Sequence, residues 1–412
     1  MFRSLLFICT LLGPLVLMAT HNRAGEIIVQ YAGDCASGSN LVCATIITYT
    51  ERGSDADRDS LPIDWGDGTI ELIARTSEVN VNGQIQRNEY RFCHNYNGPG
   101  RFFISTEDPN RIGGILNVNP PNSIQIPFSI FTVYTLTNAT FFGCNSSPIL
   151  QQPPLDRACI GEIWTHNPGA FDPDGDSLSF EFTVPLVAQG VPVPNYFFPN
   201  EIGGAGSLTI DPSTGQIEWD SPNVAGEYNL AFLVISYRNG APLDTMIRDM
   251  QILVEDCIND PPEIIKDVEE LCVVAGELIE FEVVATAPLT DTDQLVRLQA
   301  AGGPFVTVAP TATFEPTNLT GFEEDPVSRT FRWQTTCDHI STQPYFVVFR
   351  AEDNFFADTA GLSTIQTVAI RVVAPPPQNV VAEEEPGVVT VTWELPYFCE
   401  DLVNPEFEGF TV

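Results

Sequence analysis

The sequence has almost no lysine: Lys266 is the only one among 18 basic residues, and 54 Asp and Glu bring the formal net charge to −36. A charge of this size repels phosphate backbones and anionic lipid headgroups, so we expect no nucleic acid partner and no peripheral membrane binding. Histidine is also scarce, with four residues, and no two cysteines form a C-x-x-C pair. A zinc or iron–sulfur centre would therefore have few ligands.

Long apolar runs are missing as well. Beyond the N-terminus no stretch is long and apolar enough to span a bilayer, so we expect no membrane insertion, and no long segment has a helical apolar period. The patterns G-x-S-x-G, H-E-x-x-H and the P-loop are also absent. We predict that the chain is not an enzyme. The alternative is an enzyme that uses a convergent carboxylate pair, because acidic residues are abundant.

The N-terminus has the pattern of a secretory signal peptide, which we assign to residues 1–19. Arg3 gives a positive start, Ser4 to Met18 is almost wholly apolar, and Ala19 is a small residue suited to cleavage. A membrane anchor is the alternative, but the apolar run is shorter than the roughly 20 residues that a spanning helix needs.

What the sequence does contain is strand and turn signal: 33 Pro, 30 Gly and many runs of β-branched and aromatic residues. We predict strands over 43–50, 124–134, 228–237, 345–351, 364–373 and 388–393. Three proline clusters, at 148–154, 261–262 and 375–377, cannot continue a sheet ladder and therefore indicate boundaries. The prediction is an all-β chain of tandem Ig-like β-sandwich domains in an extended string. The predicted domains are 20–147, 148–259 and 260–374, and residues 375–412 are the start of a fourth.

The first of these domains contains a short turn motif of two glycines and two acids beside a tryptophan: Asp64, Trp65, Gly66, Asp67 and Gly68. Together with the later His94–Phe102 stretch it resembles the PKD (polycystic kidney disease) domain, an Ig-like sandwich. Glycine permits positive φ in a tight turn, and Asp can bond its own backbone. We interpret the motif as structural. A catalytic or metal role for the two acids is the alternative.

The second domain has Asp172, Asp174 and Asp176 alternating around a glycine, then D-P-S-T-G-Q-I at 211–217 and A-G-E-Y at 225–228. These motifs resemble the cadherin-like Ig-fold family. Three carboxylates at this spacing can converge on one calcium ion, which takes six to eight oxygens. A solvated acidic turn is the alternative. The closing Asp256, Asn259 and Asp260 resemble the calcium-binding linker of cadherins, with one residue more in the spacing.

The third domain repeats the second in outline, with Asp291 and Asp293 in the place of its acidic turn. Trp219 and Trp333 hold equivalent positions, and we interpret both as core residues, with a sugar-stacking platform as the alternative. The tail from 375 resembles the first strands of a fibronectin type III domain, with Trp393 on the second strand. We expect the chain to continue beyond residue 412.

Nine cysteines remain after the signal peptide, and disulfides in an oxidising compartment account for them best. We predict the pairs Cys159–Cys257 and Cys272–Cys337, and a partner beyond residue 412 for Cys399. The sequence leaves open the pairing of Cys35, Cys43, Cys93 and Cys144.

Several short motifs together resemble one family. They are the mature start at 20–27, Asp64–Thr69, Glu107–Arg111, Asn145–Pro148, His166–Ala170 and Arg248–Met250. They look like the N-terminal region of Bacteroidota surface proteins that carry a gliding motility-associated C-terminal domain. The resemblance implies export by type IX secretion, a secreted or outer-membrane location, and a role in gliding motility and cell adhesion.

We therefore expect a non-enzymatic, secreted or cell-surface adhesin or structural protein. Its partners would be surface polysaccharides, protein ligands or other copies of itself, and calcium would be its only cofactor. The alternative is a set of accessory binding modules on a secreted polysaccharide-degrading enzyme. Fold class does not decide between them, because Ig-like sandwiches serve many functions.

Overall fold

The structure is a computed structural model of the chain, and it describes residues 22–53, 58–204, 206–288, 294–317, 321–355 and 361–394. The predicted signal peptide, Asp291, Asp293, Cys399 and the tail after residue 394 lie outside the described residues. We refer to residues 22–147 as module 1, 148–259 as module 2 and 260–374 as module 3.

Nearly all regular structure in the described residues is β-strand, so the predicted all-β, Ig-like fold class is confirmed. The one α-helix among the described residues, α1 (Ala139–Phe142), has four residues. No helix in this part of the chain is long and apolar enough to cross a membrane. The predicted strands all form. The second begins later than expected, because residues 123–125 make a 3-10 turn before Phe128.

Modules 1 and 2 share one 14-stranded sheet, whose main path runs β4-β3-β7-β8-β19-β1-β2-β6-β5. Its members are β1 (Asn22–Tyr31), β2 (Leu41–Glu51), β3 (Ser60–Asp64), β4 (Ile70–Ala74), β5 (Ser77–Asn80), β6 (Ile85–Asn95), β7 (Gly100–Asp108), β8 (Phe128–Leu136), β10 (Leu155–Cys159), β13 (Ser177–Thr183), β14 (Leu186–Ala188), β15 (Val191–Pro192), β18 (Gly226–Arg238) and β19 (Ala241–Glu255). Module 2 adds two small sheets, from β9 (Ile149–Leu150) and β12 (Ala170–Phe171), and from β11 (Trp164–His166), β16 (Leu208–Ile210) and β17 (Ile217–Trp219).

Strand β19 joins the two modules. On one edge it forms a long hairpin with β18, closed at Asn239-Gly240, where both residues have the positive φ that favours an Asn-Gly turn. On the other edge it pairs with β8 and β1 of module 1, and then runs parallel to β10. Ile247 of β19 and Ala231 of β18 lie in the same hydrophobic cluster as Trp65 of module 1.

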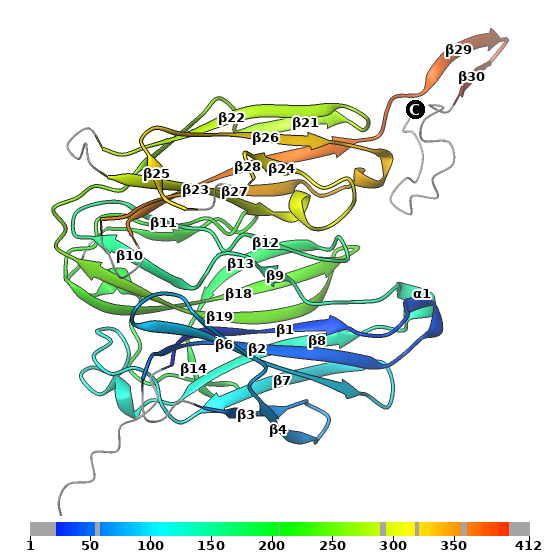
Figure 1. Cartoon of the computed structure of the whole chain (residues 1–412). Coiled ribbons are helices and arrows are strands. Elements are labelled where there is room, and N and C mark those ends of the chain that lie inside the picture. Colours follow the sequence, from blue (N-terminus) through cyan, green and yellow to red (C-terminus); the bar gives the residue numbers. More distant parts are fainter. Residues whose placement is uncertain are drawn as a thin grey trace, which may run out of the picture.

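Because modules 1 and 2 share this sheet, they lie against each other and do not form the extended string that the sequence predicts. In Figure 1 the strands of module 2 lie on top of those of module 1, and β19 lies directly over β1. The sequence did not indicate this contact, because an edge strand carries no mark of which neighbour will cover it. The domain boundaries stay a prediction, and the sheet crosses the one at 147.

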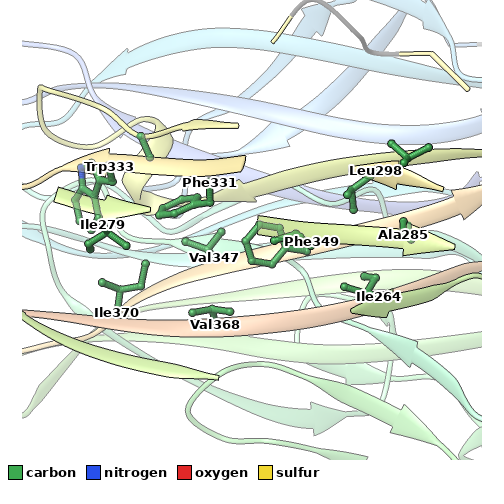
Figure 2. Packing of buried hydrophobic residues seen from close by; sticks show 14 of the residues in the cluster. Ile264, Ile279, Ala285, Leu298, Phe331, Trp333, Val347, Phe349, Val368 and Ile370 are labelled. Carbon is green, nitrogen blue, oxygen red and sulfur yellow. The ribbon is translucent and has the colours of Figure 1, made fainter. Parts of the chain in front are cut away.

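Module 3 is a sandwich of two sheets. The first contains β20 (Glu263–Lys266), β22 (Leu278–Thr286), β26 (Val327–Gln334) and β24 (Thr313–Glu315), and the second β21 (Glu270–Val274), β28 (Ser363–Val373), β27 (Tyr345–Asp353), β23 (Leu295–Gly302) and β25 (Glu323–Glu324). Inward-facing residues of both sheets, with Phe331, Trp333 and Phe349 the largest, fill the space between them (Figure 2). Burying one apolar side chain of this size stabilises the folded state by about 1.5–3 kcal/mol.

The last described element is a hairpin of β29 (Gln378–Glu385) and β30 (Val388–Glu394), which projects away from the three modules (Figure 1). It coincides with the predicted start of a fibronectin type III domain. Its apolar side chains are largely exposed, including Val388 and Val389.

Candidate functional site

The turn motif at 64–68 supports the core of module 1. Trp65 is fully buried, and its indole N–H donates to Glu71 at 2.8 Å. The His94 ring stacks on Trp65 with ring centroids 4.9 Å apart, and His94 Nε2 lies 2.7 Å from Asp67 Oδ2. These contacts fit the structural interpretation of the motif.

Gly66 is the position in this turn that only glycine can fill. Its φ is +76°, and a Cβ there would lie 2.6 Å from the backbone nitrogen of Phe103. Asp64 and Asp67 each accept a hydrogen bond from a backbone N–H two residues later. Both acids thus satisfy the turn's own backbone.

The acidic turn at 172–176 lies where module 1 meets the β18–β19 hairpin. Asp172 Oδ1 accepts from the backbone N–H of Asp174 at 2.9 Å, and Asp174 accepts from Ser146 of module 1 at 2.5 Å. Arg238, at the end of β18, donates to both oxygens of Asp176 at 2.7 and 2.6 Å. The guanidinium supplies positive charge where the sequence predicts calcium.

Burial dominates the electrostatics of this turn. It raises the pKa of Asp172 to about 8, with Asp176 adding to the effect, and it raises the pKa of Asp174 as well. Buried Asp244 nearby has its pKa raised to about 7 for the same reason. These carboxyls gain from protonation or from a cation.

The fit to calcium is incomplete. Asp172 Oδ2 is buried without a hydrogen-bond partner, as an oxygen that awaits a ligand would be. However, Arg238 occupies both oxygens of Asp176, and no three His, Cys, Asp or Glu side chains of the described ranges are placed to hold a metal ion. Calcium here stays a prediction.

The linker residues separate into two kinds. Asp256 and Asp260 are exposed, whereas Asn259 is buried between modules 2 and 3. The Asn259 side chain donates to Asp353 at 2.8 Å and accepts from Gln294 at 2.7 Å. Asn259 therefore links module 3 to the end of module 2, and calcium binding by the three linker residues stays a prediction.

Two buried ion pairs fasten module 1 to β19. Arg248 donates twice to Glu26, at 2.9 and 2.7 Å, and once to the carbonyl of Gln152 at 2.6 Å. Arg111 donates twice to Asp249, at 3.1 and 2.7 Å, and both side chains are fully buried. Bidentate pairs like these fix geometry strongly, because breaking one leaves an uncompensated buried charge.

A third buried charge cluster joins modules 2 and 3. Arg350 of β27 donates to Asp156 of β10 at 3.0 Å, and Asp156 also contacts His166 Nδ1 at 2.5 Å. Burial lowers the pKa of His166, and the carboxylate can only accept, so a neutral ring donates from Nδ1. His166 Nε2 is then a buried acceptor without a partner.

A cavity of about 710 Å³ opens beside this cluster, where the three modules meet. Module 1 contributes Arg23, module 2 contributes Glu227 and Gln251, and module 3 contributes Arg297 and Arg350. The volume lies within the range of small-ligand sites. The sequence did not indicate this cavity, because its lining residues come from strands far apart in the chain.

Three disulfides lie in the described residues: Cys35–Cys144, Cys43–Cys93 and the predicted Cys159–Cys257. The predicted pair Cys272–Cys337 is wrong. Cys272 is free and exposed, whereas buried Cys337 is disulfide-bonded to another cysteine. The error arose because sequence order does not show which way a strand residue faces, and Cys272 faces outward from edge strand β21.

Trp219 and Trp333 are core residues, with 0% and 1% exposed, so neither ring is available as a sugar-stacking platform. Trp219 packs edge-on against Tyr228, and Trp333 against Tyr345.

Comparison with known protein families gives no match, and neither does comparison with curated proteins. Similar solved structures include a chimeric titin Z1Z2-Z1Z2 tandem functionalized with a GRGDS peptide from fibronectin, at 8% identity over 55% of this chain and 99% of that chain, with a TM-score of 0.19. Others are the Clostridium thermocellum CbhA fibronectin(III)-like modules (14% identity, 55% and 95% covered, TM-score 0.17) and the D00-D0 domain of Intimin (12%, 55% and 98%, 0.19). Likenesses this distant carry no argument about function.

Proposed function

We propose that this chain is a non-enzymatic, secreted or cell-surface protein whose stacked Ig-like modules form a rigid structural and adhesive unit. The observation that carries the proposal is strand β19, which pairs with strands of both module 1 and module 2. The buried pairs Arg248–Glu26 and Arg111–Asp249 cross the same boundary. Such a joint resists bending, which suits a protein that holds a binding surface away from a cell.

An extracellular location is supported by the disulfides. Three of them among the described residues require an oxidising compartment to form and persist. The apolar N-terminal segment, read as a signal peptide, agrees with export. Many copies displayed together would add weak contacts through effective concentration.

The test is a deletion strain of the organism that encodes this chain. An antibody against the three modules should label intact parental cells and not the deletion strain, and loss of the protein should reduce surface attachment and gliding. Re-expression should restore both. Normal attachment and gliding in the deletion strain would count against an adhesive role, and labelling only after lysis would count against surface display.

A second candidate is an accessory binding unit of a secreted polysaccharide-degrading enzyme. The cavity at the junction of the three modules favours it, because a purely structural stack needs no such cavity. Identifying the covalent neighbours of this unit in the mature secreted protein, by mass spectrometry of the culture medium, distinguishes the two. A linked catalytic domain supports the second candidate.

A further inference from the structure

The cavity at the three-module junction has a lining unlike the rest of the molecule. Four of the seventeen arginines of this acidic chain line it: Arg23, Arg157, Arg297 and Arg350. They come from strands β1, β10, β23 and β27, so the lining exists only when the three modules are stacked.

Despite the arginines, the lining is close to neutral, because each guanidinium already has a carboxylate partner. Arg23 pairs with Glu227 at 3.2 Å, Arg297 with Glu352 at 2.7 Å, and Arg350 with Asp156 at 3.0 Å. Arg157 likewise pairs with Glu255. An anionic ligand would thus meet no free positive charge here, and it would be repelled by the net charge of −36.

The walls nevertheless hold unused hydrogen-bonding capacity. Four buried N–H groups there have no acceptor in the protein: Arg23 Nε, Gln251 Nε2, Arg297 Nε and Arg350 Nη1. One buried oxygen, Glu227 Oε2, has no donor. Buried polar groups left unpaired cost free energy, so a ligand or ordered water that pairs them is favoured.

Partly exposed groups at the same cavity add a surface that a ligand can reach. Gln299 is exposed on β23, and the half-buried Phe322 ring lies 4.7 Å from the Arg297 guanidinium. An amide and an aromatic ring that line one cavity offer a ligand hydrogen bonds and an apolar contact, respectively.

We propose that this cavity binds an uncharged oligosaccharide. Sugar hydroxyls both donate and accept, so one chain of sugars can meet the unpaired donors and the unpaired acceptor, and its C–H face can lie on Phe322. The volume of about 710 Å³ accommodates several sugar rings. The inference rests on the proposed function, since it names the ligand class of an adhesive or accessory binding unit.

The test is affinity electrophoresis of the full chain in native gels that contain laminarin, xyloglucan, galactomannan or soluble starch, with alginate as the anionic comparison. At least one neutral polysaccharide should retard migration. The double variant Gln299→Ala/Phe322→Ala should weaken that binding at least about tenfold, which corresponds to about 1.4 kcal/mol. Neither side chain makes a hydrogen bond to another described residue. We therefore expect the double variant to fold, and circular dichroism can check this.

The matched control is Gln189→Ala/Phe141→Ala, which removes an exposed amide and an exposed ring that do not line the cavity. It should bind as the parent does. Three outcomes overturn the inference. No neutral polysaccharide retards the chain, only alginate retards it, or the same polysaccharide retards both double variants equally. Those outcomes leave the deletion phenotype untouched, so a failure of this inference is distinguishable from a failure of the proposed function.

Discussion

Arg248 and Glu26 are 222 residues apart in the sequence, yet their side chains share two hydrogen bonds with at most 2% of either exposed. Glu26 lies on β1 and Arg248 on β19, so the pair crosses from module 1 to module 2. A buried pair adds little net stability against apolar residues of the same shape, but it penalises any arrangement in which one partner is missing. The pair therefore acts chiefly to fix how the two modules meet.

Removing one partner of this pair should destabilise the chain strongly. We expect Arg248→Met to lower the free energy of unfolding by about 3–5 kcal/mol, because Glu26 remains buried and unpaired. Urea denaturation followed by tryptophan fluorescence measures the change. Arg332→Met is the control, since its pair with Glu280 is half-exposed and contributes about 1 kcal/mol or less. Similar losses in both variants would show that burial of the pair is unimportant.

Module 1 should not fold independently of β19. A chain of residues 20–147 lacks Ile247 from its hydrophobic cluster and leaves Arg111 without Asp249. We expect it to unfold without a cooperative transition, whereas residues 20–259 should show a single transition for both modules in calorimetry. A sharp, reversible transition for 20–147 alone would contradict the shared-sheet arrangement.

Arg238 should be essential to the acidic turn. Replacing it by glutamine removes the guanidinium from Asp176 and leaves the acids at 172–176 without their counter-charge. We expect a loss of roughly 3–5 kcal/mol. Calcium binding at the turn predicts that millimolar calcium chloride restores part of this loss and that EDTA lowers the melting temperature of the unsubstituted chain. If neither occurs, Arg238 is the only cation that this turn uses.

Stability in EDTA should fall as pH rises through neutrality. Asp172 has a pKa of about 8 in the folded chain against 3.8 for an ordinary Asp, so the folded state holds its proton more tightly than the unfolded state. The contribution of Asp172 to the free energy of unfolding is therefore complete below the ordinary pKa of Asp, and it is lost as pH rises toward 8. Melting temperatures measured from about pH 5 to about pH 8 should decline, and Asp172→Asn should flatten the decline. An unchanged slope in this variant would mean that Asp172 is not the titrating group.

Cys272 should react as a native thiol. It is exposed and free, whereas Cys159 and Cys257 are joined in a disulfide. We expect iodoacetamide to label Cys272 in the folded chain without reductant, and to label Cys159 and Cys257 only after reduction, as peptide mass spectrometry can map. The predicted Cys272–Cys337 pairing would instead protect Cys272.

Several polar residues of the joints were visible in the sequence without their roles being readable. Glu26, Arg111, Asn145, His166 and Arg248 all belong to the short motifs by which the chain resembles a surface-protein family, and the structure places each in a buried contact between strands or modules. The usable signal was a charged pair inside an apolar strand, as in Met246–Met250 of β19. Such a pair is costly to bury alone and therefore indicates a partner.

By itself, the sequence determined what is local. Alternating β-branched residues specified strands, Asn239-Gly240 specified a hairpin, and Gly66 and Gly68 specified a tight turn, because these depend on backbone sterics within a few residues. Only the tertiary structure decided which strand edges meet, which charges are paired, and that a cavity lies where three modules join. Those outcomes depend on residues far apart in the chain, such as Glu26 and Arg248, which are 222 positions apart. A charged side chain on a strand looks the same in the sequence whether it will face water or a buried partner.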